Sequence, residues 1–102
     1  MSKRRPQDAI DETIHQRTRL AIMASLAGVE SLEFNELKAE LGLTDGNLST
    51  HLAALERAKY VTVTKGYKGR KPLATVGMTA RGRKAMQRYV ESLQSILDKT
   101  NM

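Results

Sequence analysis

The sequence of 102 residues contains no cysteine and no tryptophan, and its only aromatic residues are one phenylalanine and three tyrosines. The absence of cysteine excludes disulfide bonds, thiolate metal ligands and a cysteine nucleophile. No apolar run approaches the roughly 20 residues that cross a bilayer, and no apolar signal-peptide core follows the basic N-terminus. We therefore expect a single small domain, in the cytoplasm and without a membrane partner.

Sequence motifs of the common enzyme classes are also missing, because the chain has no GxxxxGK, GxSxG or HExxH pattern. The two histidines, His15 and His51, are 36 positions apart and have no carboxylate cluster beside them. We predict that the protein is not an enzyme, with no catalytic residue, no metal ligand and no cofactor. His15 and Arg17 are expected to lie at the surface or to pack between helices.

Positive charge is abundant and concentrated in one part of the chain. The formal net charge is +6, and residues 59–84 hold eight lysines or arginines and no acid, whereas residues 11–43 hold six acids and three bases. Such a block favours a polyanionic partner, bound through phosphate contacts with release of counterions. A basic surface that is merely solvated is the alternative.

Residues 44–58 have the pattern of an unusual helix. Leu48, Leu52 and Leu55 recur at i, i+4 and i+7, so they line one face, and Thr44 stands at the capping position. The opposite face carries small or hydrogen-bonding groups: Gly46, Asn47, Thr50, Ala54 and Arg57. Short polar side chains suit a helix that reads base edges in a major groove.

The residues before this helix predict the elements that pack against it. A helix is expected over residues 10–27, apolar on nearly every side in its second half and therefore buried on every side. A short extended piece at 31–33 leads to a helix at 35–41, which ends at Gly42. Two short helices joined by a glycine-containing turn form the helix-turn-helix pattern, in which the second helix enters the major groove.

The residues after it predict a β-hairpin and a last helix. Strands are expected at 60–65 and 73–78, with Val61, Val63, Val76 and Met78 facing the core. Residues 66–72 form a basic loop between them. A helix-turn-helix followed by a basic hairpin has the order of a winged helix: mainly α with a small β-hairpin, α-(β)-α-α-β-β-α.

The last helix, expected at about 79–97 after the cap Thr79, carries a long apolar stripe. Its members are Met86, Tyr89, Val90, Leu93, Ile96 and Leu97. An apolar stripe on a terminal helix is costly in water, so we predict that two copies of the chain form a homodimer through it. Packing on the chain's own first helix can account for part of the stripe.

Five stretches resemble a known family: HQRTRLAI at 15–22, FNELK at 34–38, LTDGNLSTHL at 43–52, KGYKGRKP at 65–72 and MTARGR at 78–83. They resemble small winged helix-turn-helix transcriptional regulators of the MarR/ArsR kind, over about residues 10 to 97. The resemblance implies a homodimeric, sequence-specific DNA-binding repressor or activator. Lys59 departs from the pattern, because the group usually has glycine there, at a left-handed helix end. Residues 73–78 lack the expected arginine and tyrosine, which argues against a phosphate contact by the second strand.

The resemblance also implies which residues contact double-stranded DNA. In the recognition helix they are Thr44, Gly46, Asn47, Thr50 and His51, with Arg70 at the tip of the wing. The wing residues Lys65, Lys68 and Lys71 are expected on phosphates.

Several of these roles have alternatives. Asn47 contacts a base or phosphate, or only assists the cap; Gly46 allows close approach to DNA, or only marks a turn. His51 is either a phosphate donor or a helix-packing residue, and Tyr67 either stacks at the base of the wing or simply packs.

The predicted organisation is a flexible basic arm at residues 1–9 and one winged-helix domain at 10–97. The main alternative function is a winged helix that binds another protein within a larger assembly. A basic wing without compensating acids argues against that alternative. The sequence leaves a small-molecule effector open.

Overall fold

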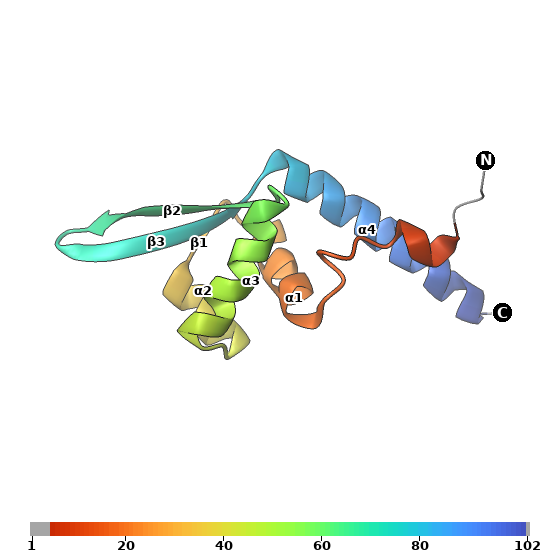
Figure 1. Ribbon diagram of the computed structural model, residues 1–102, viewed down its shortest axis with the longest axis horizontal. Helices are drawn as coiled ribbons and strands as arrows, with labels where there is room; N and C mark the ends of the chain where they lie inside the picture. Colours follow the sequence, from red (N-terminus) through yellow and green to blue (C-terminus); the bar gives the residue numbers. More distant parts are fainter. Residues whose placement is uncertain (1–4, 102) are drawn as a thin grey trace.

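The computed structural model describes residues 5–101 and contains four α-helices and a three-stranded antiparallel sheet with the order β1-β3-β2. The elements in chain order are η1 (Pro6–Ala9), α1 (Arg17–Ala27), β1 (Leu32–Glu33), α2 (Phe34–Leu41), α3 (Asp45–Arg57), β2 (Val61–Lys68), β3 (Lys71–Met78), α4 (Ala80–Asp98) and η2 (Lys99–Asn101). The β2–β3 hairpin projects from one end of the helical body and α4 from the other (Figure 1). This is the predicted winged-helix order and fold class.

The core lies where α1, α2, α3, α4 and the base of the hairpin meet. Its buried side chains are Ile14, Ile22, Met23, Leu26, Leu37, Leu48, Leu52, Leu55, Val61, Val76, Ala85 and Tyr89. The three leucines predicted on the inner face of α3 are all among them, as are Val61 and Val76. Val63 and Met78 are partly buried and pack against this cluster. The periodicities of two in the strands and about 3.6 in α3 therefore identified the inward faces correctly.

The first helix is shorter than predicted, because α1 begins at Arg17 and not at residue 10. The Asp11 carboxylate accepts hydrogen bonds from the backbone N–H groups of Thr13 and Ile14, which closes a turn. The Gln16 side chain then accepts from the N–H of Arg19 and caps α1. Short polar side chains that bond to nearby backbone compete with helix formation, so the apolar repeat alone misplaced the start.

Two further details of the N-terminal half differ from expectation. Of the arm predicted at residues 1–9, residues 1–4 lie outside the described part, and Pro6–Ala9 form a 3-10 helix that contacts α4. The second half of α1 is not buried on every side, because Ala24 and Ala27 are exposed. Alanine carries too little apolar surface to require burial, so the apolar count overstated the buried face.

The helix-turn-helix is built as the sequence predicts. Glu33 and Glu36 form a capping box at the start of α2, and Gly42 ends that helix with a left-handed φ of 63°. Lys38 near the end of α2 pairs with Asp45 at the start of α3, with Nζ and Oδ1 2.8 Å apart. The Lys38–Asp45 pair thus links the end of α2 to the start of α3 across the turn.

The hairpin strands are longer than predicted, and the loop at 66–72 is wrong. Gly66 pairs with Leu73 and Tyr67 with Pro72, which leaves only Gly69 and Arg70 in the turn. Gly69 has a φ of 64°, as the first position of a two-residue hairpin turn requires. Pro72 is tolerated because β1 pairs only with Thr75 and Val76, so β3 has an open edge at Pro72. The wing is therefore a two-stranded hairpin that is paired along its whole length, up to the two-residue turn.

Candidate nucleic-acid interface

The exposed start of α3 has hydrogen-bonding groups that the fold does not use. Thr44 Oγ1 accepts from the backbone N–H of Asn47 at 3.1 Å, so Thr44 serves as the cap. The Thr50 hydroxyl donates to the Gly46 carbonyl at 2.9 Å, which leaves its methyl group and its lone pairs for a partner. The exposed carboxamide of Asn47 makes no hydrogen bond with any residue of the described part of the chain, so both its donor and its acceptor are free.

Gly46 is also unexplained by the protein's own packing. A Cβ at this position would meet no atom within 4 Å, and its φ does not lie in the left-handed region. The fold itself therefore does not demand glycine here. A surface that approaches the α3 backbone closely would demand it.

His51 lies on the flank of α3 and is partly buried, and its Nδ1 is 3.3 Å from Nη1 of Arg19 in α1. A guanidinium only donates hydrogen bonds, so Nδ1 is the acceptor and the ring proton of neutral His51 is on Nε2. Burial, and then the charge of Arg19, lower the pKa of His51 below its ordinary value. His51 therefore has a packing partner, and its Nε2–H donor faces a different direction.

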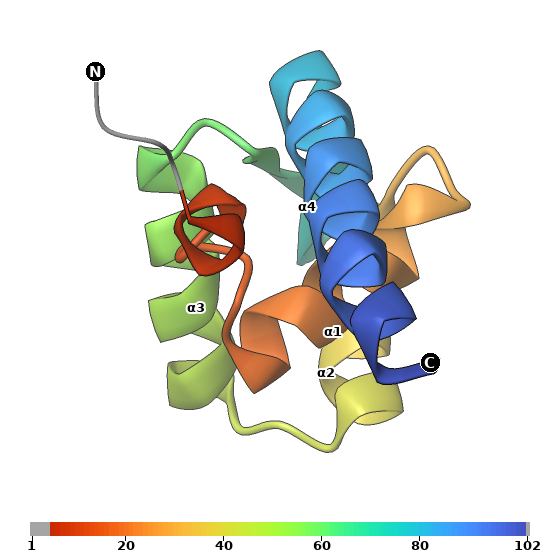
Figure 2. The same cartoon turned by 90° about the vertical axis from the view of Figure 1, so that its right-hand side faces the viewer.

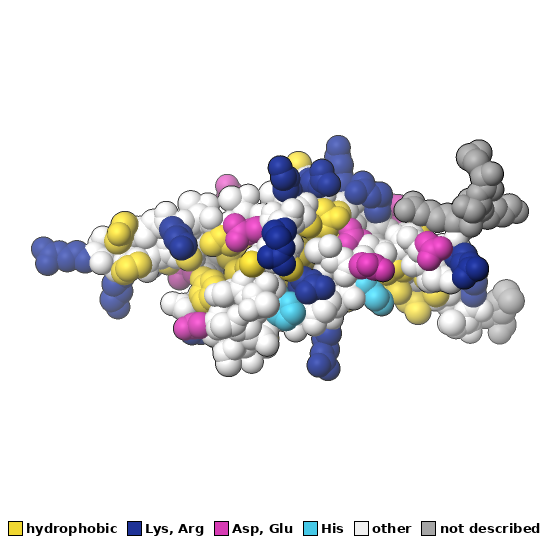
Figure 3. Space-filling view, viewed as in Figure 1, with side chains coloured by type: hydrophobic (Ala, Val, Ile, Leu, Met, Phe, Trp, Pro, Cys, Tyr) yellow, Lys and Arg dark blue, Asp and Glu magenta, His cyan; other side chains and the backbone are white. Residues whose placement is uncertain are grey.

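The wing carries cations without partners. Lys65, Lys68, Arg70 and Lys71 are exposed, and Lys68 stands directly opposite Lys71 across the hairpin. Like charges in that arrangement destabilise a hairpin. The only ion pair within residues 5–101 is Lys38–Asp45, so no described carboxylate compensates the wing. Figure 3 shows the dark-blue side chains of lysine and arginine at the far tip of the wing, away from the magenta acidic side chains.

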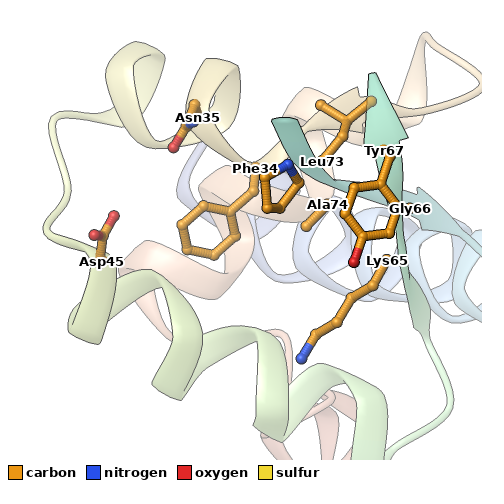
Figure 4. Close-up of a pocket in the computed structure, with 9 residues that line it drawn as sticks. Phe34, Asn35, Asp45, Lys65, Gly66, Tyr67, Leu73 and Ala74 are labelled. Carbon is orange, nitrogen blue, oxygen red and sulfur yellow. The ribbon is translucent and has the colours of Figure 1, made fainter. Parts of the chain in front are cut away.

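Lys65 differs from the three cations at the tip. It belongs to the same face of β2 as Val63, and its side chain extends toward α3 (Figure 4). It lines an open cleft of about 560 Å³ between the wing and the helix-turn-helix, with Phe34, Asn35, Asp45, Tyr67 and Leu73 among the other lining residues. The Tyr67 side chain is 76% exposed, so it is not a packed residue of the wing. The cleft thus places one cation and one exposed aromatic ring between the wing and the start of α3.

The predicted apolar stripe of α4 divides between two faces. Tyr89 is only 2% exposed, and its hydroxyl is 2.9 Å from Nδ1 of His15, so it lies in the core of its own chain. Val90 and Leu97 are 52% and 46% exposed. Three residues are partly buried: Met86, Leu93 and Ile96.

Two arginines near this interface had no predicted contact with DNA. Arg17 is the first residue of α1 and is exposed, and Arg19 reaches α3 through His51. They are two of the three bases in the acidic segment at 11–43, which is the one sequence signal that distinguishes them.

Within residues 5–101, no group of three or more histidine, aspartate or glutamate side chains is placed to hold a metal ion. Over the same residues, no helix has both the length and the apolar character of a membrane span.

Comparison with known proteins agrees with this geometry. Residues 18–97 match the family described as the winged helix DNA-binding domain. An uncharacterized protein of Methanocaldococcus jannaschii is 40% identical over 72 residues, which cover 71% of this chain and 78% of the relative. A transcriptional regulator homologue from Pyrococcus horikoshii OT3 is 29% identical, with a TM-score of 0.85 over 90% of this chain and 91% of its own.

A transcriptional regulator of M. tuberculosis, solved in complex with DNA, shares the fold at 22% identity, with a TM-score of 0.70 over 93% of this chain and 68% of its own. The match over residues 18–97 and the identity to the archaeal relative lead to one conclusion: the chain belongs to the winged helix DNA-binding domain family.

Proposed function

We infer that the protein is a DNA-binding transcriptional regulator that reads sequence with α3 and holds the phosphate backbone with the wing. The observation that carries this function is the wing tip, where Lys68 faces Lys71 beside Arg70 without any described acid to compensate them. The repulsion between these cations decreases when a polyanion binds to them. A wing that bound a protein surface would not need this arrangement.

In this function α3 enters the major groove with its N-terminal end leading. The free carboxamide of Asn47 can bond to adenine N6 and N7 together, a pair worth about 1–3 kcal/mol of discrimination. Gly46 lets the backbone come close to the base pairs, and Thr50 offers a methyl group for thymine. Arg70 at the tip of the wing suits the minor groove, where negative potential attracts arginine.

The protein also acts as a homodimer in this proposal. Met86, Val90, Leu93 and Leu97 follow one another at i, i+4, i+7 and i+11 on α4, beside the face that Tyr89 buries. Figure 2 shows α3 and α4 on opposite sides of α1, so a partner on α4 would leave α3 free for DNA. A symmetric dimer would read two half-sites, in the cytoplasm of a prokaryotic cell.

The proposal is tested with DNA fragments selected from a random pool, which give the half-site and the spacing. Arg70→Ala should weaken binding to selected and random DNA alike and reduce the slope of log K against log salt by about 0.9. Asn47→Ala should lose about 1–3 kcal/mol on selected DNA and little on random DNA.

Gln94→Ala, which removes an exposed amide on α4, is the matched control and should change neither affinity. If Asn47→Ala loses the same affinity on both DNA pools, Asn47 does not read bases. If the unmodified protein selects no fragment and shows no dependence on salt, the protein-binding alternative gains support.

A further inference from the structure

Arg19 connects α1 to the recognition helix in an unusual way. Its Nε donates to the Thr13 carbonyl at 2.5 Å, and its Nη1 donates to Nδ1 of His51 at 3.3 Å. Both acceptors are uncharged. No carboxylate among the described residues forms an ion pair with Arg19, and the side chain is partly buried.

This arrangement leaves the charge of Arg19 without a counterion. A guanidinium has five N–H donors, and the two hydrogen bonds to Thr13 and His51 use only part of that capacity. Removing a cation from water without a partner is costly. The two neutral acceptors therefore fix the direction of the guanidinium and leave its remaining donors for an anion.

Two further arginines extend this surface. Arg57 lines the same open cleft of about 470 Å³ as Arg19, between the segment at residues 12–13 and the end of α3. Arg17, the first residue of α1, is also exposed; residues two apart in a helix point to different sides, so Arg17 lies outside this cleft and adds a positive charge beside it. Glu12 also lines the cleft and Glu56 lies next to Arg57 in the chain, but both are exposed and neither forms an ion pair with a described residue.

The position of these arginines relative to the wing is informative. In Figure 1 the wing extends to one side of α3, and the start of α1 lies on the other side. Figure 3 shows dark-blue side chains in the middle of this face, over α3 and α1, separate from those at the wing tip. A helix in the major groove has a phosphate backbone along each flank. The wing can contact the phosphate backbone on only one of these two flanks.

We propose that Arg17, Arg19 and Arg57 form a second phosphate-binding surface, the α1-side surface, which holds the DNA backbone on the flank of α3 away from the wing. Arg17 and Arg19 bind phosphate directly. Arg19 also holds the His51 ring with its proton on Nε2, so that His51 presents one N–H donor beside it. The inference rests on the proposed DNA-binding function and predicts that α3 is clamped from two sides.

The first test measures DNA affinity against salt concentration for single variants. Arg17→Ala is the primary variant, because Arg17 is exposed and has no side-chain hydrogen bond with the described residues. It should lower the slope of log K against log salt by about 0.9, as much as Arg70→Ala does on the wing. Arg19→Gln should lower it similarly, and its thermal melting curve reports whether the variant is folded.

Lys99→Ala is the matched control, because it removes one exposed positive charge in η2, beyond the end of α4. It should leave the slope unchanged. An equal loss for Lys99→Ala and Arg17→Ala would indicate an effect of net charge and would overturn the α1-side surface.

The second test locates the contacts by ethylation interference on a selected DNA fragment. Arg17→Ala and Arg70→Ala should each abolish interference at a different group of phosphates, one on each side of the major groove that α3 occupies. If Arg70→Ala changes the pattern and Arg17→Ala does not, the second surface is overturned and the proposed function stands. If the unmodified protein shows no protected phosphates and no salt dependence, the proposed function itself fails.

Discussion

At the scale of single residues, Lys59 shows how α3 ends. Its φ is 65°, the only left-handed value at a non-glycine residue in the described part of the chain. The N–H of Tyr60 bonds to the Leu55 carbonyl and the N–H of Lys59 to the Glu56 carbonyl, which is the Schellman arrangement. The left-handed backbone that usually takes glycine is therefore present at Lys59, as the sequence predicts.

The first prediction follows from this strain. Lys59→Gly should raise the free energy of unfolding by about 1 kcal/mol, because a side chain in the left-handed region costs roughly that amount. Urea denaturation followed by circular dichroism measures the change. Lys84→Gly is the matched control: Lys84 is an exposed residue inside α4, so glycine there should lower stability by about 1 kcal/mol. A loss of stability in Lys59→Gly would show that the Lys59 side chain stabilises more than the strain costs.

At the scale of elements, local sequence and tertiary contacts contribute differently to the boundaries. Thr44 and Thr79 cap α3 and α4 at the predicted positions, because a cap requires only a side chain and an N–H three residues later. The start of α1 and the length of the wing were predicted wrongly. The start of α1 depends on the turn that Asp11 makes with the backbone of Thr13 and Ile14. The length of the wing depends on pairing between two strands, which the periodicity of either strand alone does not predict.

Gly82 provides the prediction at this scale. A Cβ at Gly82 would lie 2.1 Å from the backbone oxygen of Tyr60, which also accepts the N–H of Thr79 at 3.0 Å. Gly82→Ala should therefore destabilise the protein by about 1–3 kcal/mol through overpacking, although alanine normally favours a helix by about 1 kcal/mol over glycine. The midpoint of thermal or urea unfolding measures the change.

Gly46→Ala is the control for Gly82→Ala, because Gly46 is also a helical glycine and a Cβ there meets open space. It should keep or raise stability by up to about 1 kcal/mol and weaken DNA binding instead. If both alanine variants are equally stable, the close contact between α4 and Tyr60 is relieved by a small shift of the helix.

At the scale of the whole molecule, two faces of α4 differ in their exposure. One face closes the core through Gly82, Ala85 and Tyr89, which are buried. The neighbouring face leaves Val90 and Leu97 about half exposed, at 52% and 46%. Large exposed apolar side chains on one helix indicate an interaction surface.

The prediction at this scale concerns the dimer. Val90→Glu combined with Leu97→Glu should convert a dimer into monomers, because burying two carboxylates in an apolar contact is costly. Light scattering at micromolar concentration measures the mass, and circular dichroism checks that the helices persist. Val29→Glu is the control, because Val29 is an exposed valine outside α4 and should leave the mass unchanged. A dimeric mass for the double variant would place the interface elsewhere.

The sequence by itself determined the helix-turn-helix, the caps Thr44 and Thr79, the inward leucines of α3 and the basic block at residues 59–84. Each of these depends on residues near one another in the chain. The tertiary structure decided which apolar residues of α4 face its own core, because Tyr89 meets His15 across 74 positions. It also brought Arg19 to His51, 32 positions away, and placed the two on the flank of α3. Contacts between residues so far apart in the sequence form only when the helices pack, so periodicity and composition do not predict them.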